Sequence, residues 1–294
     1  MSLLEGLLLL DKPSGITSYQ ALSLLKKTFY PNKIGHAGTL DRFATGLLLV
    51  LVGSYTKLVD FFMEFEKEYL ATLEFGKETD TLDPEGKVIA LGPVPTVSTI
   101  ENQISSFLGT IWQVPPLYSA VHIGGERAYR KARKGKPIEL PSRPVFIRSI
   151  EIVNYSPPLL TLRVVCGKGT YIRSLARDLG KKCGTVAYLK DLSRLRLGEL
   201  TVSDALLPSQ IDPAHLKKGE ELLSSLFPGR VLRILSTWGV SYGKPLAISL
   251  FQFVEFSEGP YILVDEKSNL AGVVQYSKGA LSYRFVVANT HENT

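Results

Sequence analysis

The chain has little cysteine and no long apolar run. Only two of its 294 residues are cysteines, Cys166 and Cys183, and neither belongs to a C-x-x-C pair. We therefore expect neither a disulfide framework nor a cysteine-based zinc site. The longest apolar stretch, residues 46–52, is too short to cross a bilayer, and no basic segment precedes the apolar residues 6–10. These absences predict a cytoplasmic protein without a membrane anchor or an export signal.

Motifs that bind common cofactors are also absent. The sequence holds no G-x-G-x-x-G, G-x-x-x-x-G-K-[S/T], H-E-x-x-H or G-x-S-x-G motif. Its four histidines are scattered along the chain and predict no metal cluster. The acidic stretch TDTLDPEG, residues 79–86, lacks the spacing of a calcium loop and is interpreted as a turn. We expect chemistry that needs neither a cofactor nor a metal ion.

Positive charge is concentrated in the first two thirds of the chain. Residues 1–205 hold 26 Lys and Arg against 20 Asp and Glu, whereas residues 206–294 hold 8 of each sign. The densest basic run comprises Arg127, Arg130, Lys131, Arg133, Lys134, Lys136, Arg143 and Arg148. Such a run can attract a phosphate backbone, and a solvated helix face followed by a basic loop would have the same composition.

Hydrophobic periodicity predicts an α+β chain. Strands are expected at residues 6–10, 46–52, 68–76, 144–155, 159–166 and 186–197, and helices at residues 18–29, 54–65, 98–108, 170–182 and 203–206. Ser54 and Ser98 are predicted to cap two of these helices. Because helices and strands do not alternate regularly, we expect a mixed, largely antiparallel central sheet with flanking helices. A segment rich in short strands and turns follows, which predicts a large domain at residues 1–228 and a small β-rich domain at residues 229–294.

One carboxylate stands just before a predicted buried strand. Residues 35–50 read GHAGTLDRFATGLLLV, which places His36 and Asp41 among glycines and other small residues. Small residues would let a substrate approach the backbone closely. An aspartate in such a loop can equally cap a turn, and a histidine there can be structural. The pattern alone makes Asp41 a candidate catalytic group and leaves the structural interpretation open.

A second candidate cluster lies in CGKGTYIRSLARDLG, residues 166–180. Tyr171 and Arg173 fall at the first turn of the predicted helix, from which side chains can project into a cleft. Arg173 precedes Arg177 by four residues, a spacing that is unfavourable for like charges unless one of them has an acidic partner. A buried carboxylate would satisfy Arg173, and so would a surface acid or solvent.

Five segments together resemble one family of RNA-modifying enzymes. LLLLDKPSGITS, GHAGTLDRFATG, KEYLATLEFGKETDTLDPEG, QVPPLYSAVHIGGERAYRKARKG and CGKGTYIRSLARDLG follow one another as in bacterial tRNA pseudouridine-55 synthases, the TruB family. The resemblance covers most of residues 6–200. It implies a pseudouridine synthase fold, and the C-terminal segment loosely resembles a PUA-type RNA-binding barrel. It also implies a monomer that isomerises uridine 55 in the T-loop of tRNA without a cofactor.

The resemblance implies roles for individual residues as well. Asp41 would be the catalytic nucleophile and Arg173 its ionic partner. Tyr69 would stack on the target base and lie where a proton must leave C5. The remaining family positions are His36, Tyr171 and Leu192 around the flipped nucleotide, Lys12 and Pro13 beneath the catalytic loop, and Arg127, Arg130, Lys131, Arg133, Lys134 and Lys136 on an RNA-clasping loop.

Residues 42 and 43 depart from the family pattern. After TLD the family commonly continues Pro-Leu, whereas Arg42 and Phe43 follow here. Loss of the proline is expected to loosen the loop, and Arg42 adds a positive charge beside Asp41. The alternative functions are a tRNA-folding chaperone without catalysis and an N-glycosidase that hydrolyses the same bond.

Overall fold

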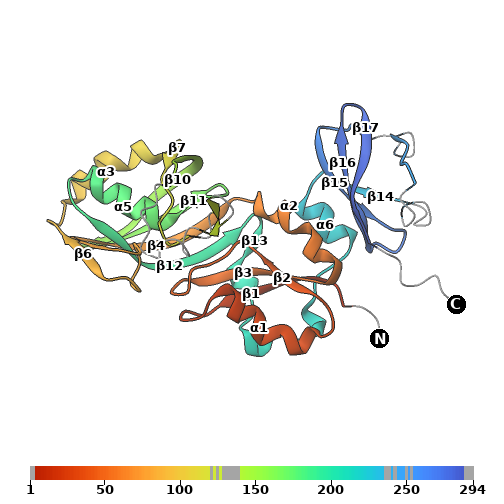
Figure 1. Cartoon of the computed structure of the whole chain (residues 1–294), viewed down its shortest axis with the longest axis horizontal. Helices are drawn as coiled ribbons and strands as arrows, with labels where there is room; N and C mark the ends of the chain where they lie inside the picture. The colour runs from red at the N-terminus through yellow and green to blue at the C-terminus, as the bar shows by residue number, and fades with distance from the viewer. Residues whose placement is uncertain are drawn as a thin grey trace.

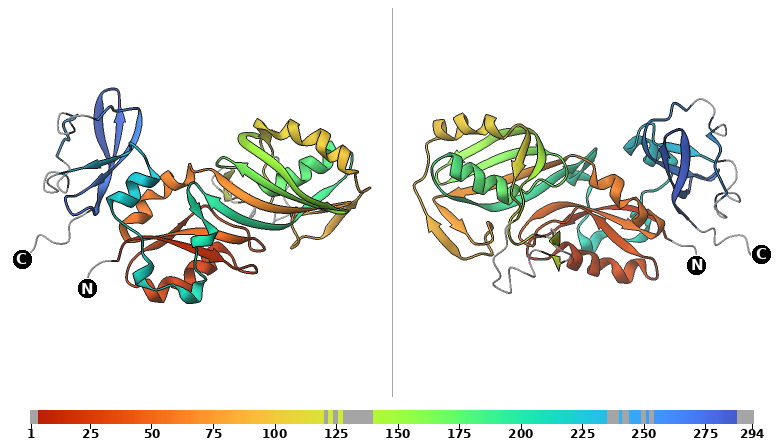
Figure 2. Two further views of the ribbon diagram at one scale, coloured as in Figure 1. Left: turned by 180° about the vertical axis from the view of Figure 1, so that it is seen from behind. Right: turned by 45° about the horizontal axis from the view of Figure 1, so that its top comes forward.

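Two β-sheets organise the protein. The computed structural model describes residues 4–119, 122–123, 126–127, 140–234, 240, 244–248, 251 and 254–287. A large sheet runs through the body of the molecule, and a small sheet lies at the end away from α3 (Val97–Ile104) and α5 (Ile172–Lys182) (Figures 1 and 2). Within these described ranges, no helix is long and apolar enough to cross a lipid bilayer.

The large sheet is mixed and largely antiparallel. Its main strands, in spatial order, are β1 (Gly6–Lys12), β3 (Thr45–Val52), β12 (Ala187–Leu197), β4 (Lys67–Phe75), β11 (Leu159–Cys166), β10 (Arg143–Ser156) and β7 (Gly109–Gln113). At its margins, β2 (Ile34–Ala37) pairs with β3, and β13 (Leu200–Thr201) pairs with β12. The β3–β12 contact is parallel, and the other described contacts of this sheet are antiparallel. The predicted α+β class is confirmed.

Strand β3 is buried on both of its faces. Successive side chains of a strand point to opposite faces, and here the two faces belong to two different hydrophobic clusters. Leu48 and Val50 lie in the cluster that includes α1 (Ser18–Phe29), whereas Leu47 and Leu49 lie in the second cluster. Each buried aliphatic side chain of this size contributes roughly 1.5–3 kcal/mol. The strand therefore anchors the loop that precedes it, which carries Asp41.

The structure corrects two predicted helix starts. The helix expected from residue 54 is a 3-10 turn, η1 (Gly53–Leu58), followed by the short α2 (Val59–Met63), and Ser54 does not cap it. In α3, the hydroxyl of Thr96 accepts the first-turn backbone hydrogen bond, so Ser98 is not the cap. Threonine and serine are close in their preference for this position, which explains why the sequence pattern misplaced the start.

Two further connections refine the prediction. The stretch TDTLDPEG, interpreted as a turn, joins β5 (Lys77–Thr79) to β6 (Val88–Leu91) in a small antiparallel hairpin. The short helix expected near residue 203 is the 3-10 turn η3 (Val202–Asp204). The helix expected at residues 170–182 begins at Ile172, as α5.

The C-terminal sheet follows α6 (Glu220–Leu226). Its strands, in order, are β14 (Val231–Arg233), β15 (Gly259–Val264), β16 (Leu270–Ser277) and β17 (Ala280–Val286). This β-rich unit is consistent with the PUA-like expectation. One hydrophobic cluster contains both Leu47 of β3 and Val264 of β15, so both sheets contribute residues to it. The division at residue 228 stays a prediction.

Candidate active site

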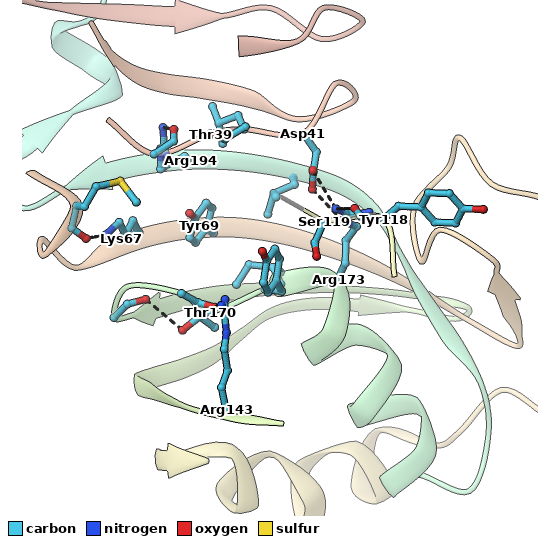
Figure 3. Close-up of a pocket in the computed structure, with 18 residues that line it drawn as sticks. Thr39, Asp41, Lys67, Tyr69, Tyr118, Ser119, Arg143, Thr170, Arg173 and Arg194 are labelled. Carbon is cyan, nitrogen blue, oxygen red and sulfur yellow. Dashed lines mark hydrogen bonds and ion pairs between the residues drawn. The ribbon is translucent and has the colours of Figure 1, made fainter. Parts of the chain in front are cut away.

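A pocket of about 540 Å³ opens where β4, β12, the start of α5 and the loop before β3 meet (Figure 3). Its volume lies in the range of small-molecule sites. Five of the residues to which the family resemblance assigns a role line it although they are far apart in the chain. These are Asp41, Tyr69, Tyr171, Arg173 and Leu192.

Asp41 and Arg173 form a two-point ion pair in the pocket wall (Figure 3). Arg173 Nη2 donates to Asp41 Oδ1 at 3.0 Å, and Arg173 Nε lies 2.9 Å from Asp41 Oδ2. The arginine side chain is only 5% exposed, whereas that of Asp41 is 34% exposed. The carboxylate therefore faces the pocket while its cationic partner lies behind it.

A second carboxylate, Asp83, holds the other side of the same guanidinium. Arg173 Nη1 donates to Asp83 Oδ2 at 2.9 Å and to the carbonyl of Thr81 at 3.0 Å, and Nη2 also donates to the carbonyl of Tyr118 at 3.0 Å. Asp83 is itself buried. The sequence pattern at Asp83 indicates only a simple turn, and its contact with Arg173 was not predicted. Two carboxylates and two backbone carbonyls fix the orientation in which Arg173 meets Asp41.

Burial raises the pKa of Asp41, and the positive charge of Arg173 opposes that rise. The negative charge of Asp83 adds to it. The site thus balances one arginine against two carboxylates in a partly desolvated pocket. The Arg173 pair keeps a carboxylate available that the surroundings would otherwise protonate more readily.

Lys12 supports the loop from below without lining the pocket. Its buried ammonium donates to the carbonyls of Pro13, Ile16 and Arg42, at 2.9, 2.7 and 3.4 Å. Desolvation lowers the pKa of Lys12 to about 8. Pro13 is exposed, and its carbonyl accepts one of these hydrogen bonds from Lys12. Its side chain does not line the pocket.

Arg42 also connects this loop to its neighbours. Its Nε donates to the carbonyl of Gly15 at 2.8 Å and lies 3.7 Å from Glu85 Oε1. Its own carbonyl accepts from the Gly15 N–H at 2.9 Å. Phe43 is buried in the core. Arg42 therefore makes contacts across the loop where the sequence analysis expected only a lost proline and an added charge.

Arg194 of β12 is a further pocket residue that the sequence analysis missed. It is 1% exposed and donates to the carbonyl of Leu47 at 2.7 Å and to that of Gly38 at 2.9 Å. A Cβ atom at Gly46 would lie 2.4 Å from the Arg194 carbonyl oxygen, and one at Gly38 would lie 2.9 Å from Arg194 Nη1. Because glycine has no side chain, Gly38 and Gly46 leave room for Arg194. Of these two glycines, only Gly38 lines the pocket.

His36 is not brought into the lining of this pocket. It lies on β2, and its Nδ1 is buried without a hydrogen-bond partner among the described residues. Burial lowers its pKa, and the charge of Arg194 lowers it further, which favours the neutral imidazole. The role that the family resemblance implies for His36 thus has no pocket contact to support it.

Of the predicted RNA-clasping run, only Arg127 lies among the residues that the structure describes. Arg130, Lys131, Arg133, Lys134 and Lys136 lie outside the described residues, and Arg127 belongs to the short strand β9 (Glu126–Arg127), paired with β8 (His122–Ile123).

Other polar groups complete the pocket. Arg143 lies with its guanidinium carbon 5.0 Å from the centre of the Tyr171 ring. Ser119 Oγ is buried without a hydrogen-bond partner within the described part of the chain. Desolvation lowers the pKa of the buried Lys67 to about 8. No group of three or more metal-binding side chains occurs among the residues described. The pocket lining offers aromatic, cationic and hydroxyl contacts around the carboxylate of Asp41.

Comparison with known proteins gives consistent matches. A model of the N-terminal domain of TruB family pseudouridylate synthases matches residues 26–172. A protein named tRNA pseudouridine synthase B from Borreliella burgdorferi (strain ZS7) is 44% identical over 223 residues, which cover 75% of this chain and 79% of that relative. One of the same name from Dehalococcoides mccartyi is 37% identical over 271 residues, covering 84% of this chain and 89% of the relative.

Solved structures show the same fold. An H/ACA RNP bound to a substrate RNA containing 2'-deoxyuridine superposes with a TM-score of 0.69 at 21% identity, covering 96% of this chain and 84% of that chain. This likeness extends over both sheets. The family model and the two relatives complete the assignment: the chain belongs to the TruB family of pseudouridylate synthases.

Proposed function

We propose that this pseudouridine synthase isomerises uridine 55 in the T-loop of tRNA, with Asp41 as the nucleophile. The observation that carries the proposal is the Asp41–Arg173 pair, in which a half-buried carboxylate faces the pocket and a buried arginine stands behind it. The names of the relatives support tRNA as the substrate.

The reaction suits a site of this composition. The bond between C1′ of the ribose and N1 of uracil breaks, the base rotates, and C1′ rejoins the base through C5. Asp41 attacks either C1′ or C6 and is released at the end. N1 gains a proton and C5 loses one, so the isomerisation is balanced without an oxidant or a reductant. Tyr69 lines the pocket, where it can receive the proton from C5.

The target uridine must leave its stacked position to reach Asp41. Flipping a base costs a few kcal/mol, which stacking on aromatic rings and phosphate contacts offset. The pocket offers the rings of Tyr69 and Tyr171 and the cation of Arg143. We assign the basic run 127–136 and the C-terminal sheet to RNA contacts outside the pocket. In line with the family resemblance, we propose that the protein is a monomer located in the cytoplasm.

A T stem-loop transcript tests the proposal directly. The wild-type protein should release tritium from uridine labelled at C5, and the product should be pseudouridine at position 55 alone. D41N should abolish release and leave the dissociation constant for the RNA within a few fold. D178N, which changes a carboxylate outside the pocket, is the matched control and should retain activity.

The alternative functions give different products. An N-glycosidase would liberate free uracil, which chromatography of the wild-type reaction would detect. A folding chaperone would bind the transcript and release no tritium. Either result, or full activity of D41N, would overturn the proposal.

A further inference from the structure

Arg194 is a charged side chain that is buried in the interior of the protein. It is 1% exposed, and in β12 it follows Leu192 by two residues, so both side chains point to the pocket face of the sheet. Burial of an arginine is costly unless its donors are used. Its partners therefore indicate what the residue does.

Two of those partners flank the catalytic loop. Arg194 Nη2 donates to the carbonyl of Gly38, three residues before Asp41, and Nε donates to the carbonyl of Leu47, six residues after it. Gly38 has a φ of +82°, in the left-handed region, and a Cβ there would lie only 2.9 Å from Arg194 Nη1. Arg194 thus holds both ends of the loop that presents Asp41.

The third neighbour is Tyr69. Arg194 and Tyr69 are directly opposite in the antiparallel pair of β12 and β4, which places their side chains on one face (Figure 3). Burial raises the pKa of the Tyr69 phenol, whereas the nearby positive charge of Arg194 lowers it. Arg194 therefore offsets part of the effect of burial and favours negative charge on the phenol oxygen.

The titratable neighbours of the pair act in opposite directions. Asp41 and Cys166 disfavour a phenolate at Tyr69, whereas Arg194 favours it. Lys67 and His36 also sense the Arg194 charge, which lowers the pKa of each. The groups facing the Arg194–Tyr69 pair are Asp41, Cys166, Lys67 and His36.

We propose that Arg194 is a positioning residue with two roles in the reaction: it fixes the loop of Asp41, and it stabilises Tyr69 as the acceptor of the C5 proton. The inference rests on the proposed isomerisation. After C1′ has rejoined the base through C5, the C5–H bond breaks, its electron pair restores the C5–C6 double bond, and the proton passes to the Tyr69 phenolate. The phenolate forms by loss of a proton to water, and N1 takes a proton from water.

A deuterium isotope effect separates this role from a merely structural one. Single-turnover rates are measured for a T stem-loop carrying either ordinary uridine or uridine deuterated at C5. For R194Q we expect a rate at least about tenfold below wild type, within the range of acid–base contributions. We also expect a larger deuterium isotope effect than in wild type, because removal of the C5 proton becomes slower. RNA affinity should stay within a few fold.

Matched variants make the test decisive. R196Q changes an arginine of the same strand that pairs with Glu68 outside the pocket, and its rate and isotope effect should equal those of wild type. R194K keeps the charge and should restore part of the rate. In a Y69F background, R194Q should lose its influence on the isotope effect.

Three outcomes would overturn the inference. A wild-type rate in R194Q would remove any role in the reaction. A slower R194Q with an unchanged isotope effect would leave only the loop contact. Persistence of the R194Q isotope effect in Y69F would remove Tyr69 from the step. If R194Q does not fold, R194K takes its place. A wild-type protein that forms no pseudouridine would instead refute the proposed function, so the two failures are distinguishable.

Discussion

The guanidinium of Arg173 meets both oxygens of the Asp41 carboxylate across 132 positions of sequence, with Nη2 3.0 Å from Oδ1 and Nε 2.9 Å from Oδ2. A planar fork can make these two contacts and still reach Asp83 and a backbone carbonyl. A lysine ammonium has no such fixed geometry. The position of Asp41 thus depends on the shape of its partner as well as on its charge.

Substitution R173K should therefore slow the chemical step severely. Hydrogen bonds to charged groups contribute about 1.5–3 kcal/mol each, so loss of one or two in the transition state corresponds to a rate lowered by roughly tenfold to about 20,000-fold. Single-turnover formation of pseudouridine measures it. R177K, on the same helix and paired with Asp178, should behave as wild type. An R173K rate within twofold of wild type would contradict this assignment.

Removal of the Asp83 carboxylate should lower the reaction rate and shift its pH dependence. D83N takes an anchor from Arg173, and we expect a rate lowered by about tenfold to a hundredfold at neutral pH. The charge of Asp83 raises the pKa of Asp41, so its loss lowers that pKa. In the proposed mechanism Asp41 reacts as a carboxylate, so activity should fall as the pH drops through its pKa. The acidic limb of the D83N profile should thus move to lower pH, and a shift to higher pH would refute the electrostatic account.

Lys12 gives a prediction about stability and pH. Its pKa is about 8 in the folded protein and 10.5 for the unperturbed group. Between these values the unfolded chain binds more protons than the folded one, so wild-type stability gains from this group as the pH rises. The free energy of unfolding should therefore exceed that of K12M by more at pH 10 than at pH 7. Urea titrations at both pH values measure it, and a difference independent of pH would show that the pKa of Lys12 is not lowered.

Arg42 should matter much less than its position beside Asp41 implies. Its side chain is 59% exposed, and its contact with Glu85 is 3.7 Å long. Exposed ion pairs contribute about 0.2–1 kcal/mol, so R42A should lose no more than about fivefold in rate. E85Q is the companion variant that removes the ionic part alone. A hundredfold loss in R42A would mean that the Gly15 contact governs the loop.

Regular elements could be predicted from the sequence because their periodicity is strong. The helix at residues 18–29 matches α1, and the strand at residues 159–166 matches β11. Helix starts were harder, since a local cap such as Thr96 competes with similar residues nearby. Residues 79–86 were expected to be a turn, and they join two short strands that pair as a hairpin.

The site was accessible mainly through the family resemblance. Periodicity placed Arg173 at a helix start, but no local pattern could specify which carboxylates it meets. Asp83 was missed because a buried acid and a turn acid share the same sequence context. For Arg194 a signal existed: the alternation of β12 places it on the face of Leu192, where a charged residue is unusual. An inward charge in a strand thus indicates a buried hydrogen-bond partner even when no motif marks it.

Strand β3 connects the loop of Asp41 to two hydrophobic clusters, and this has a consequence for the dissection of the protein. Removal of the C-terminal sheet would take Ile262, Val264 and Val273 out of the cluster that also holds Leu47 and Leu49 of β3. The carbonyl of Leu47 is a partner of Arg194. The C-terminal sheet is therefore not a module that can be trimmed freely, because its residues and those of β3 belong to one buried cluster.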